Sequence, residues 1–102
     1  MKKFYVHITE SAEEDIDEAL NYIITIKHNP TAAANLLEEI ETKKNTIADF
    51  PFKYQTIDDS LLDFLGIRSM PVKNYYAFYM VERNDIYIIR FLHQKQNWKR
   101  EF

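Results

Sequence analysis

The stretch GIRSMPVKNYYAFYMVERNDIYIIRFLHQKQNW, Gly66–Trp98, decides the fold of this chain. Two of its segments, Tyr75–Val81 and Ile86–His93, are rich in the β-branched and aromatic residues that are typical of strands. A short polar connection, Glu82–Asp85, joins them, and Asn and Asp tolerate the left-handed backbone that tight turns need. We therefore predict an antiparallel hairpin, with the nearby segment Ile67–Lys73 pairing as a third strand.

The residues before this stretch predict one strand and the start of a helix. Lys2–Ile8 alternates apolar and polar side chains with the period of a strand. The apolar face of this strand holds Phe4, Val6 and Ile8, and the other face holds Tyr5 and His7. Thr9 and Ser11 both qualify as caps of the helix that follows, and Ser11 has the capping-box spacing to Glu14.

Two helices follow, each with a stripe of apolar residues at helical spacing. The first stripe consists of Ala12, Ile16, Ala19, Leu20, Ile23 and Ile24, with a predicted end near Lys27 or His28. Asn29 and Pro30 suit the start of a second helix, because Asn caps and proline fits the first turn. The second stripe consists of Ala33, Leu36, Leu37, Ile40, Lys44 and Ile47, and Phe50-Pro51 ends this helix. Pro51–Leu65 is predicted as an irregular connection with one turn of helix.

The predicted order is therefore β-α-α-β-β-β in a single domain spanning residues 1–102. An amphipathic helical hairpin must bury its stripes, and an antiparallel sheet of three or more strands offers a matching face. We predict an α+β fold in which the helical hairpin packs on an antiparallel sheet. With 46% hydrophobic residues, the chain has enough apolar surface to form a core.

Composition narrows the classes of function. The chain has no cysteine, which excludes disulfides, thiolate metal sites and a cysteine nucleophile. It has no apolar run long enough to span a membrane and no signal-peptide core, so we expect a cytoplasmic protein. Residues 1–65 carry six lysines and arginines against thirteen acids, and residues 66–102 carry seven against three. The basic C-terminal part either meets an anionic partner or is attracted to the acidic helices.

A series of short motifs resembles the RelE/ParE superfamily of type II toxin–antitoxin toxins, a plasmid-stabilisation family. The motifs are Thr9–Asp15, Tyr22-Ile23, Asn29–Ala33, Leu36-Leu37, Ile47–Pro51, Gly66–Arg68, Val72–Tyr75, Phe78-Tyr79, Leu92-His93 and Trp98-Lys99. Each is short, so their order and spacing over nearly the whole chain carry the resemblance. It implies a β-α-α-β-β-β toxin fold and a cognate antitoxin as partner, whose C-terminal segment wraps the helical hairpin and a sheet edge.

The superfamily has two branches, and the resemblance is closer to the ParE-like one. RelE-like members cut messenger RNA in the ribosome, whereas ParE-like members poison DNA gyrase and lack a nuclease constellation. At the place of the nuclease arginine this chain has Tyr76, and at the places of the paired lysines it has Ile67 and Ser69. The terminal tyrosine of the nucleases is also unmatched. We therefore expect growth inhibition by gyrase binding, without catalysis.

Two other functions stay open. The first is a ribosome-dependent endoribonuclease with a substituted site that uses Arg68, His93 and Lys95. Imidazole titrates near neutrality and the cations could stabilise a phosphate, so the chemistry is feasible without a metal. The second is a decayed toxin that survives as an antitoxin-binding module. It would bind its partner without arresting growth.

Several side chains are candidates for binding the partner or target. They are Arg68, Lys73, Arg90, Trp98, Lys99 and Arg100. Arg68 and Arg90 either bind such a partner by their planar guanidinium groups, pair with Glu82 or Asp85, or lie with their charged ends at the rim of the sheet. The tail with Trp98 and Phe102 either packs on the sheet as a terminal helix or extends toward a partner. His7 and His28 show no ligand spacing to a carboxylate, so neither a metal nor another cofactor is expected.

Overall fold

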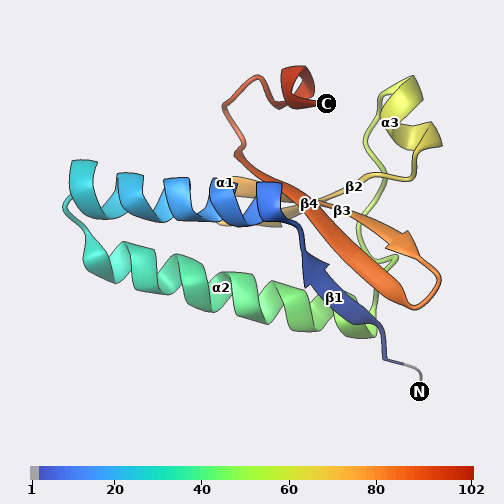
Figure 1. The fold of residues 1–102 in the computed structure, drawn as a ribbon, viewed down its shortest axis with the longest axis horizontal. Coiled ribbons are helices and arrows are strands. Elements are labelled where there is room, and N and C mark those ends of the chain that lie inside the picture. The colour runs from blue at the N-terminus through green and yellow to red at the C-terminus, as the bar shows by residue number, and fades with distance from the viewer. Residues whose placement is uncertain (1–2) are drawn as a thin grey trace.

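A four-stranded sheet covered by a helical hairpin organises the computed structural model, which describes residues 3–102 (Figure 1). The strands are β1 (Tyr5–Ile8), β2 (Arg68–Val72), β3 (Tyr75–Glu82) and β4 (Asp85–His93), in the order β1-β4-β3-β2. The C-terminal strands form the predicted antiparallel meander, while β1 runs parallel to β4, so that the sheet is mixed. The α+β fold is confirmed. Lys2, the predicted start of the first strand, lies outside the described residues.

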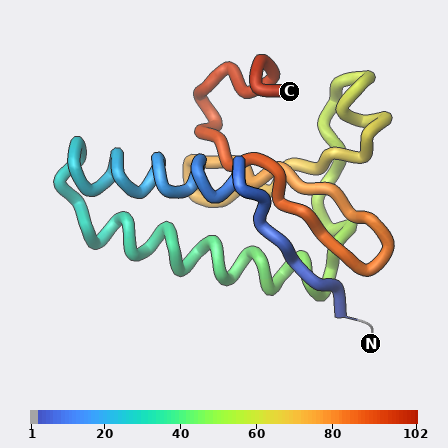
Figure 2. The backbone as a smooth tube through the Cα atoms, in the orientation of Figure 1, coloured from blue at the N-terminus to red at the C-terminus, as the bar shows by residue number. Residues whose placement is uncertain are grey.

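The hairpin consists of α1 (Glu10–Asn21), a π-helical turn (Tyr22–Ile26) and α2 (Pro30–Asp49). Its tip projects beyond the sheet (Figure 2). Thr9 rather than Ser11 caps α1, because the Thr9 hydroxyl accepts a hydrogen bond from the Ala12 N–H at 3.3 Å. The predicted cap of α2 is confirmed, since the Asn29 side chain accepts from the Ala32 N–H at 3.0 Å.

The π-helical turn makes one predicted core position wrong. A π turn holds more residues than an α turn, so the residues after it rotate relative to the stripe of α1. Ile24 therefore faces outward with 46% of its surface exposed, whereas Ile23 still packs against the core. In the sequence, the apolar residues Ile23 and Ile24 continue the stripe of α1, so the spacing did not predict the change from an α turn to a π turn.

Both faces of the sheet are covered. The face toward the hairpin carries the first core, to which β3 contributes Ala77 and Tyr79 and β4 contributes Ile86, Ile88 and Phe91. The opposite face carries a second core of Ile57, Leu62, Ile67, Phe78 and Leu92. Leu62 comes from α3 (Ser60–Phe64), the single helical turn predicted within Pro51–Leu65. Because β3 is covered on both sides, its side chains are apolar on both faces.

The two tight turns of the meander place cations in the left-handed conformation. Lys73 has φ +55° and Arg83 has φ +57°, and each is followed by an asparagine. We expected Asn84 or Asp85 to take this conformation in the β3–β4 turn, which is wrong. The loop has only two residues, Arg83 and Asn84, and the first of them has to turn the chain.

Tyr79 ties β3 to the end of α2 and makes stability depend on pH. Its side chain is fully buried, and its hydroxyl donates to the Pro51 carbonyl at 2.8 Å. Burial raises the pKa of Tyr79 to about 12, although the positive charge of Arg68 lowers it. Below the unfolded pKa near 10, this group favours the folded state, and the benefit is lost as pH rises from about 10 to 12.

We therefore expect alkaline pH to destabilise this protein through Tyr79. Between pH 9 and pH 11 its ionisation should remove about 1 kcal/mol of unfolding free energy. Urea unfolding at the two pH values measures the loss, and Tyr79→Phe should show a loss that is smaller by this amount. Equal losses in the two proteins would contradict the assignment.

Candidate functional site

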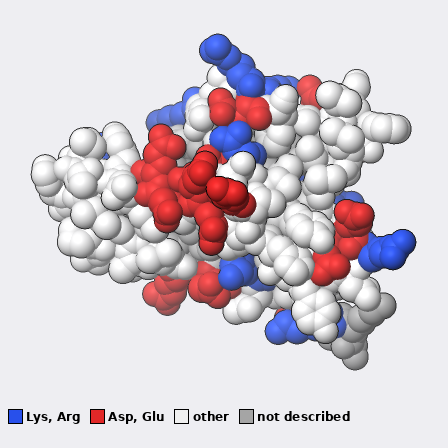
Figure 3. Space-filling model, viewed as in Figure 1, with Lys and Arg blue, Asp and Glu red and all other residues white. Residues whose placement is uncertain are grey.

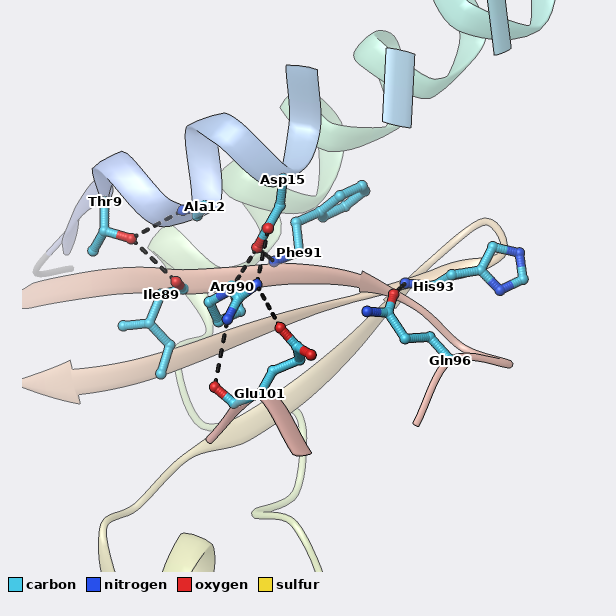
Figure 4. A network of polar contacts seen from close by, with 9 residues as sticks. All are labelled: Thr9, Ala12, Asp15, Ile89, Arg90, Phe91, His93, Gln96 and Glu101. Atoms are coloured by element: carbon cyan, nitrogen blue, oxygen red, sulfur yellow. Dashed lines mark hydrogen bonds and ion pairs between the residues drawn. The ribbon is translucent and has the colours of Figure 1, made fainter. Parts of the chain in front are cut away.

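Arg90 joins three parts of the chain in one polar network (Figure 4). Its Nε donates to Asp15 Oδ2 of α1 at 2.7 Å, and its Nη2 donates to Asp15 Oδ1 at 3.0 Å. The same Nη2 contacts Glu101 Oε1 at 3.3 Å in the C-terminal turn. The hydrogen bonds that the Arg90 guanidinium donates to Asp15 are the main cause that raises the pKa of Arg90. The bidentate geometry makes this the strongest ion pair of the described residues.

The network also completes the edge of β4. Strand β1 ends at Ile8, so the second half of β4 has no neighbouring strand on that side. There the Thr9 hydroxyl donates to the Ile89 carbonyl, and the Asp15 carboxylate accepts from the Phe91 N–H at 3.0 Å. Side chains of α1 thus take the place of a strand. Arg90 is held by this arrangement, so its role in the fold is structural.

Neither arginine forms the ion pair with Glu82 or Asp85 that was one of its open alternatives. Arg90 pairs with Asp15 and Glu101, and neither Glu82 nor Asp85 contacts it. The Asp85 carboxylate instead contacts His7 Nε2 at 2.8 Å. The Arg90–Asp15 pair was not predicted, because Asp15 lies 75 residues before Arg90 and meets it only through the crossing of α1 over β4.

The C-terminal tail packs on the second face of the sheet. Its 3₁₀ turn, Trp98–Glu101, places the Trp98 ring 5.1 Å from the Phe78 ring, and Phe102 stacks edge-on against the same ring at 5.1 Å. Trp98 is therefore half-buried, and the packed alternative for the tail matches the structure. Lys95, Lys99 and Arg100 remain exposed along it.

The three residues of the ribonuclease hypothesis do not come together. Arg68 faces Tyr79 in the middle of β3, whereas His93 faces Tyr75 at the start of β3. Four residues of strand separate these positions, which is about 13 Å at 3.3 Å per residue. His93 Nδ1 accepts a hydrogen bond from the Lys95 N–H at 3.0 Å, so that ring nitrogen is engaged in a local turn.

A cleft of about 530 Å³ lies where the nuclease residues are replaced. Tyr76 and Ser69 line it together with Tyr54, Trp98 and Lys99, while Ile67 is buried beneath the sheet surface. Asp58 and Lys99 are the only charged groups in its lining. Phosphoryl transfer needs a cluster of positive charge, and the lining of this cleft contains a single cation, Lys99.

Two hollows follow the helical hairpin. One, of about 340 Å³, lies between α1 and α2 and is lined by Ile8, Ile16, Leu20, Leu37 and Ile40, with Glu13, Asp17 and Glu41 at its rim. The other, of about 480 Å³, runs between β1 and the second half of α2. Glu41 lines both, so they form one track, which we call the hairpin–β1 track. Figure 3 shows the acidic side chains gathered over α1.

The two edges of the sheet differ. At β1, Tyr5 and Thr9 direct their N–H groups to β4, so Val6 and Ile8 direct theirs to the outside, where no strand of residues 3–102 pairs. At β2, the Ser69 N–H already donates to the Gln55 carbonyl, and Pro71 has no N–H. Only the β1 edge can accept another strand over its length.

Comparison with known proteins decides the family. Residues 6–98 match the model of the ParE toxin of the type II toxin–antitoxin system parDE. The chain belongs to this ParE toxin family. No curated protein matches it. Among solved structures it is similar to the chromosomal ParDE toxin–antitoxin system from P. aeruginosa, with TM-score 0.69 and 17% identity over 91% of this chain and 98% of that one.

It is also similar to the RelBE2 toxin–antitoxin complex from Mycobacterium tuberculosis, with TM-score 0.64 and 17% identity over 90% of this chain and 99% of that one. The ParE family thus shares its fold with a RelE-type toxin. Because identity is low in both cases, these likenesses show the fold alone. The resemblance seen in the sequence is confirmed.

The remaining predicted binding residues of this ParE-family chain are dispersed. Lys73 lies in the β2–β3 turn, 3.9 Å from Glu39 of α2, and Arg68 donates to the Tyr54 carbonyl at 2.7 Å. Lys99 and Arg100 lie on the tail. Among residues 3–102 no group of three metal-ligating side chains exists, and no helix is long and apolar enough to cross a membrane.

Two lysines that lie near Arg68 were not predicted from the sequence. Lys43 of α2 and Lys53 lie over the Tyr54 ring, at 6.0 Å and 5.5 Å from its centre. The Arg68 guanidinium lies 5.0 Å from the centre of the Phe52 ring. These three cations converge only because α2, the loop after it and β2 meet at one end of the sheet.

Proposed function

We propose that this ParE-family protein is a toxin that arrests growth by binding DNA gyrase and has no catalytic activity of its own. One observation carries the choice between the branches. The cleft at the nuclease position is lined by Tyr76 and Ser69 in place of cations, and Arg68 and His93 face positions of β3 that are four residues apart. Without clustered charge, cleavage of RNA would have no stabilised transition state.

We further propose that an antitoxin encoded beside this chain neutralises it along the hairpin–β1 track. The apolar floor of the track suits one face of an amphipathic helix, and the β1 edge suits an added strand. Since Glu13, Asp17 and Glu41 rim the floor, the docking segment should carry lysines and arginines beside its apolar anchors.

Primer extension on abundant messages, minutes after induction of the protein without antitoxin, tests the target. We expect growth arrest with intact messages, and inhibition of supercoiling when the purified protein is added to DNA gyrase. His93→Ala should act like the unmodified protein in both assays, because His93 takes part in no step of gyrase binding.

Two results would overturn the gyrase proposal. New 5′ ends inside coding regions that disappear in His93→Ala and Lys95→Ala would make the protein a ribonuclease. Normal growth and unaffected gyrase, together with tight antitoxin binding, would make it a binding module that has lost toxicity.

Leu37 tests the antitoxin track. This side chain is 49% exposed in the groove between α1 and α2, so Leu37→Ser should weaken antitoxin binding at least tenfold and leave growth arrest intact. Calorimetric titration with the antitoxin measures the change. Ile24→Ser, equally apolar and 46% exposed at the hairpin tip, is the matched control and should bind normally. Equal weakening in both variants would place the antitoxin elsewhere.

A further inference from the structure

An apolar hollow with unpaired positive charge lies where α2 ends. Phe50 and Phe52 are 57% and 61% exposed and, with Asp49, Pro51 and Lys53, line a hollow of about 620 Å³. Arg68 lies over the Phe52 ring, and Lys43 lies over the ring of Tyr54, which follows Lys53 in the chain. None of the three cations forms an ion pair with a carboxylate of the described residues. We call Phe50, Phe52, Lys43, Lys53 and Arg68 the basic hollow; its lining also contains the acid Asp49, so three cations stand against one carboxylate.

A knob of the opposite charge projects from α3 and the residues around it. Leu61, Phe64 and Leu65 are 63%, 84% and 45% exposed, which makes Phe64 the most exposed large apolar side chain of residues 3–102. The segment that carries them, residues 54–67, has three acids, Asp58, Asp59 and Asp63, and no lysine or arginine. We call Leu61, Phe64, Leu65 and Asp58 the acidic knob.

The knob cannot fill the hollow of its own chain. Leu62, in the middle of α3, is 4% exposed in the second core, and the Thr56 hydroxyl donates to Asp63 at 2.5 Å. These contacts hold α3 over the face of the sheet that is opposite to the hairpin. Phe52, in contrast, packs edge-on against Phe4, which belongs to the first core. The two surfaces therefore stay separate within one molecule.

We propose that the basic hollow binds the acidic knob of a second copy of this chain. Both surfaces are apolar in the middle and charged at the rim, with opposite signs, which is the pattern of a complementary interface. The end of α2, where the hollow lies, and α3, which carries most of the knob, are toward the same end of the molecule (Figure 1). A two-fold axis at that end makes the contact twice and closes the dimer.

No residue of the basic hollow or the acidic knob lines the hairpin–β1 track, although Phe52 packs against Phe4, which lines the half of the track beside β1. The proposal does not depend on the gyrase target. In this dimer, the exposed aromatic residues at the end of α2 contact the acidic knob of the second copy.

Sedimentation equilibrium of the full chain tests the proposal. Between about 1 and 200 µM in low salt, we expect the mean mass to rise from 12.3 kDa toward twice that value. Added NaCl at about 0.5 M should weaken association, because the rim charges are screened. Phe64→Ser should weaken it at least tenfold, whereas Ile26→Ser, 62% exposed at the hairpin tip, should not.

Reversing the charge at Asp58 or at Lys53 tests the contact, because mixing the two variants should restore association. Asp58→Lys and Lys53→Glu should each impair association, because each homodimer then contains two repulsive contacts. Mixed in equal amounts, the two variants should associate again, since one contact is then Lys against Glu and the other keeps the original Asp58 and Lys53. Both positions are exposed, so both variants should fold.

The proposal would be overturned by a mean mass that stays at that of one chain over the whole range. It would also be overturned by a dimer that tolerates Phe64→Ser, or by single charge variants that fail to associate when mixed. Any of these results would place the contact elsewhere or remove it.

Discussion

Phe78→Ala should lower the free energy of unfolding by about 4 kcal/mol, which is the usual cost of removing a fully buried aromatic ring. Phe78 is 0% exposed and touches the rings of Tyr76, Trp98 and Phe102. Its loss leaves a cavity in the second core and removes the surface on which the tail packs. Urea unfolding measures the change, and the midpoint of thermal unfolding should fall by roughly 20 °C.

The same variant reports on the tail directly. Trp98 is the only tryptophan of the chain, so its fluorescence reflects its surroundings alone. We expect its emission to shift to longer wavelength in folded Phe78→Ala, because the indole becomes exposed to water. Phe64→Ala is the matched control, since Phe64 is 84% exposed and its loss should cost less than about 0.5 kcal/mol. An unchanged Trp98 emission in Phe78→Ala would show that the tail is held by other contacts.

Asp15→Ala should have the second largest effect, a loss of about 3 kcal/mol. The Asp15 and Arg90 side chains are 11% and 23% exposed, so removing the carboxylate leaves a charge with little access to water. It also leaves the Phe91 N–H at the edge of β4 without its acceptor. Urea unfolding near neutral pH measures the change.

Two further variants separate the ion pair from the edge. Arg90→Met removes the charge and keeps the Phe91 hydrogen bond, so it should cost less than Asp15→Ala. Asp17→Ala removes an exposed acid of the same helix and should change stability by no more than about 0.5 kcal/mol. If Asp17→Ala costs as much as Asp15→Ala, the effect comes from the helix and not from the network.

Much of the fold could be predicted because its signals are local. The β-branched and aromatic residues of Tyr75–Val81 and Ile86–His93, the cap at Asn29 and the stop at Phe50-Pro51 each act over a few residues. Backbone angles and side-chain period respond to such neighbours directly. The resemblance to the toxin superfamily also rests on short motifs, and the match over residues 6–98 confirms it.

The candidate site could be predicted only in part. The replacement of the nuclease arginine by Tyr76 is visible in the sequence. The cleft around Tyr76 accordingly has only one cation in its lining, Lys99. The partners of Arg90 and the π-helical turn after Asn21 were not visible. A charge carries no sign of its partner when the two lie 75 residues apart, and the apolar stripe ran through the π turn unchanged.

The sequence by itself determined the order of strands and helices, the apolar faces and the family, because local period and capping act along the chain. The tertiary structure alone decided which charges meet. It brought Asp15 to Arg90, gathered Lys43 and Lys53 around Arg68, and placed an acidic knob and a basic hollow at one end. Coulomb and apolar contacts depend on distance in space, and the crossing of α1 over β4 and the meeting of α2 with β2 set those distances.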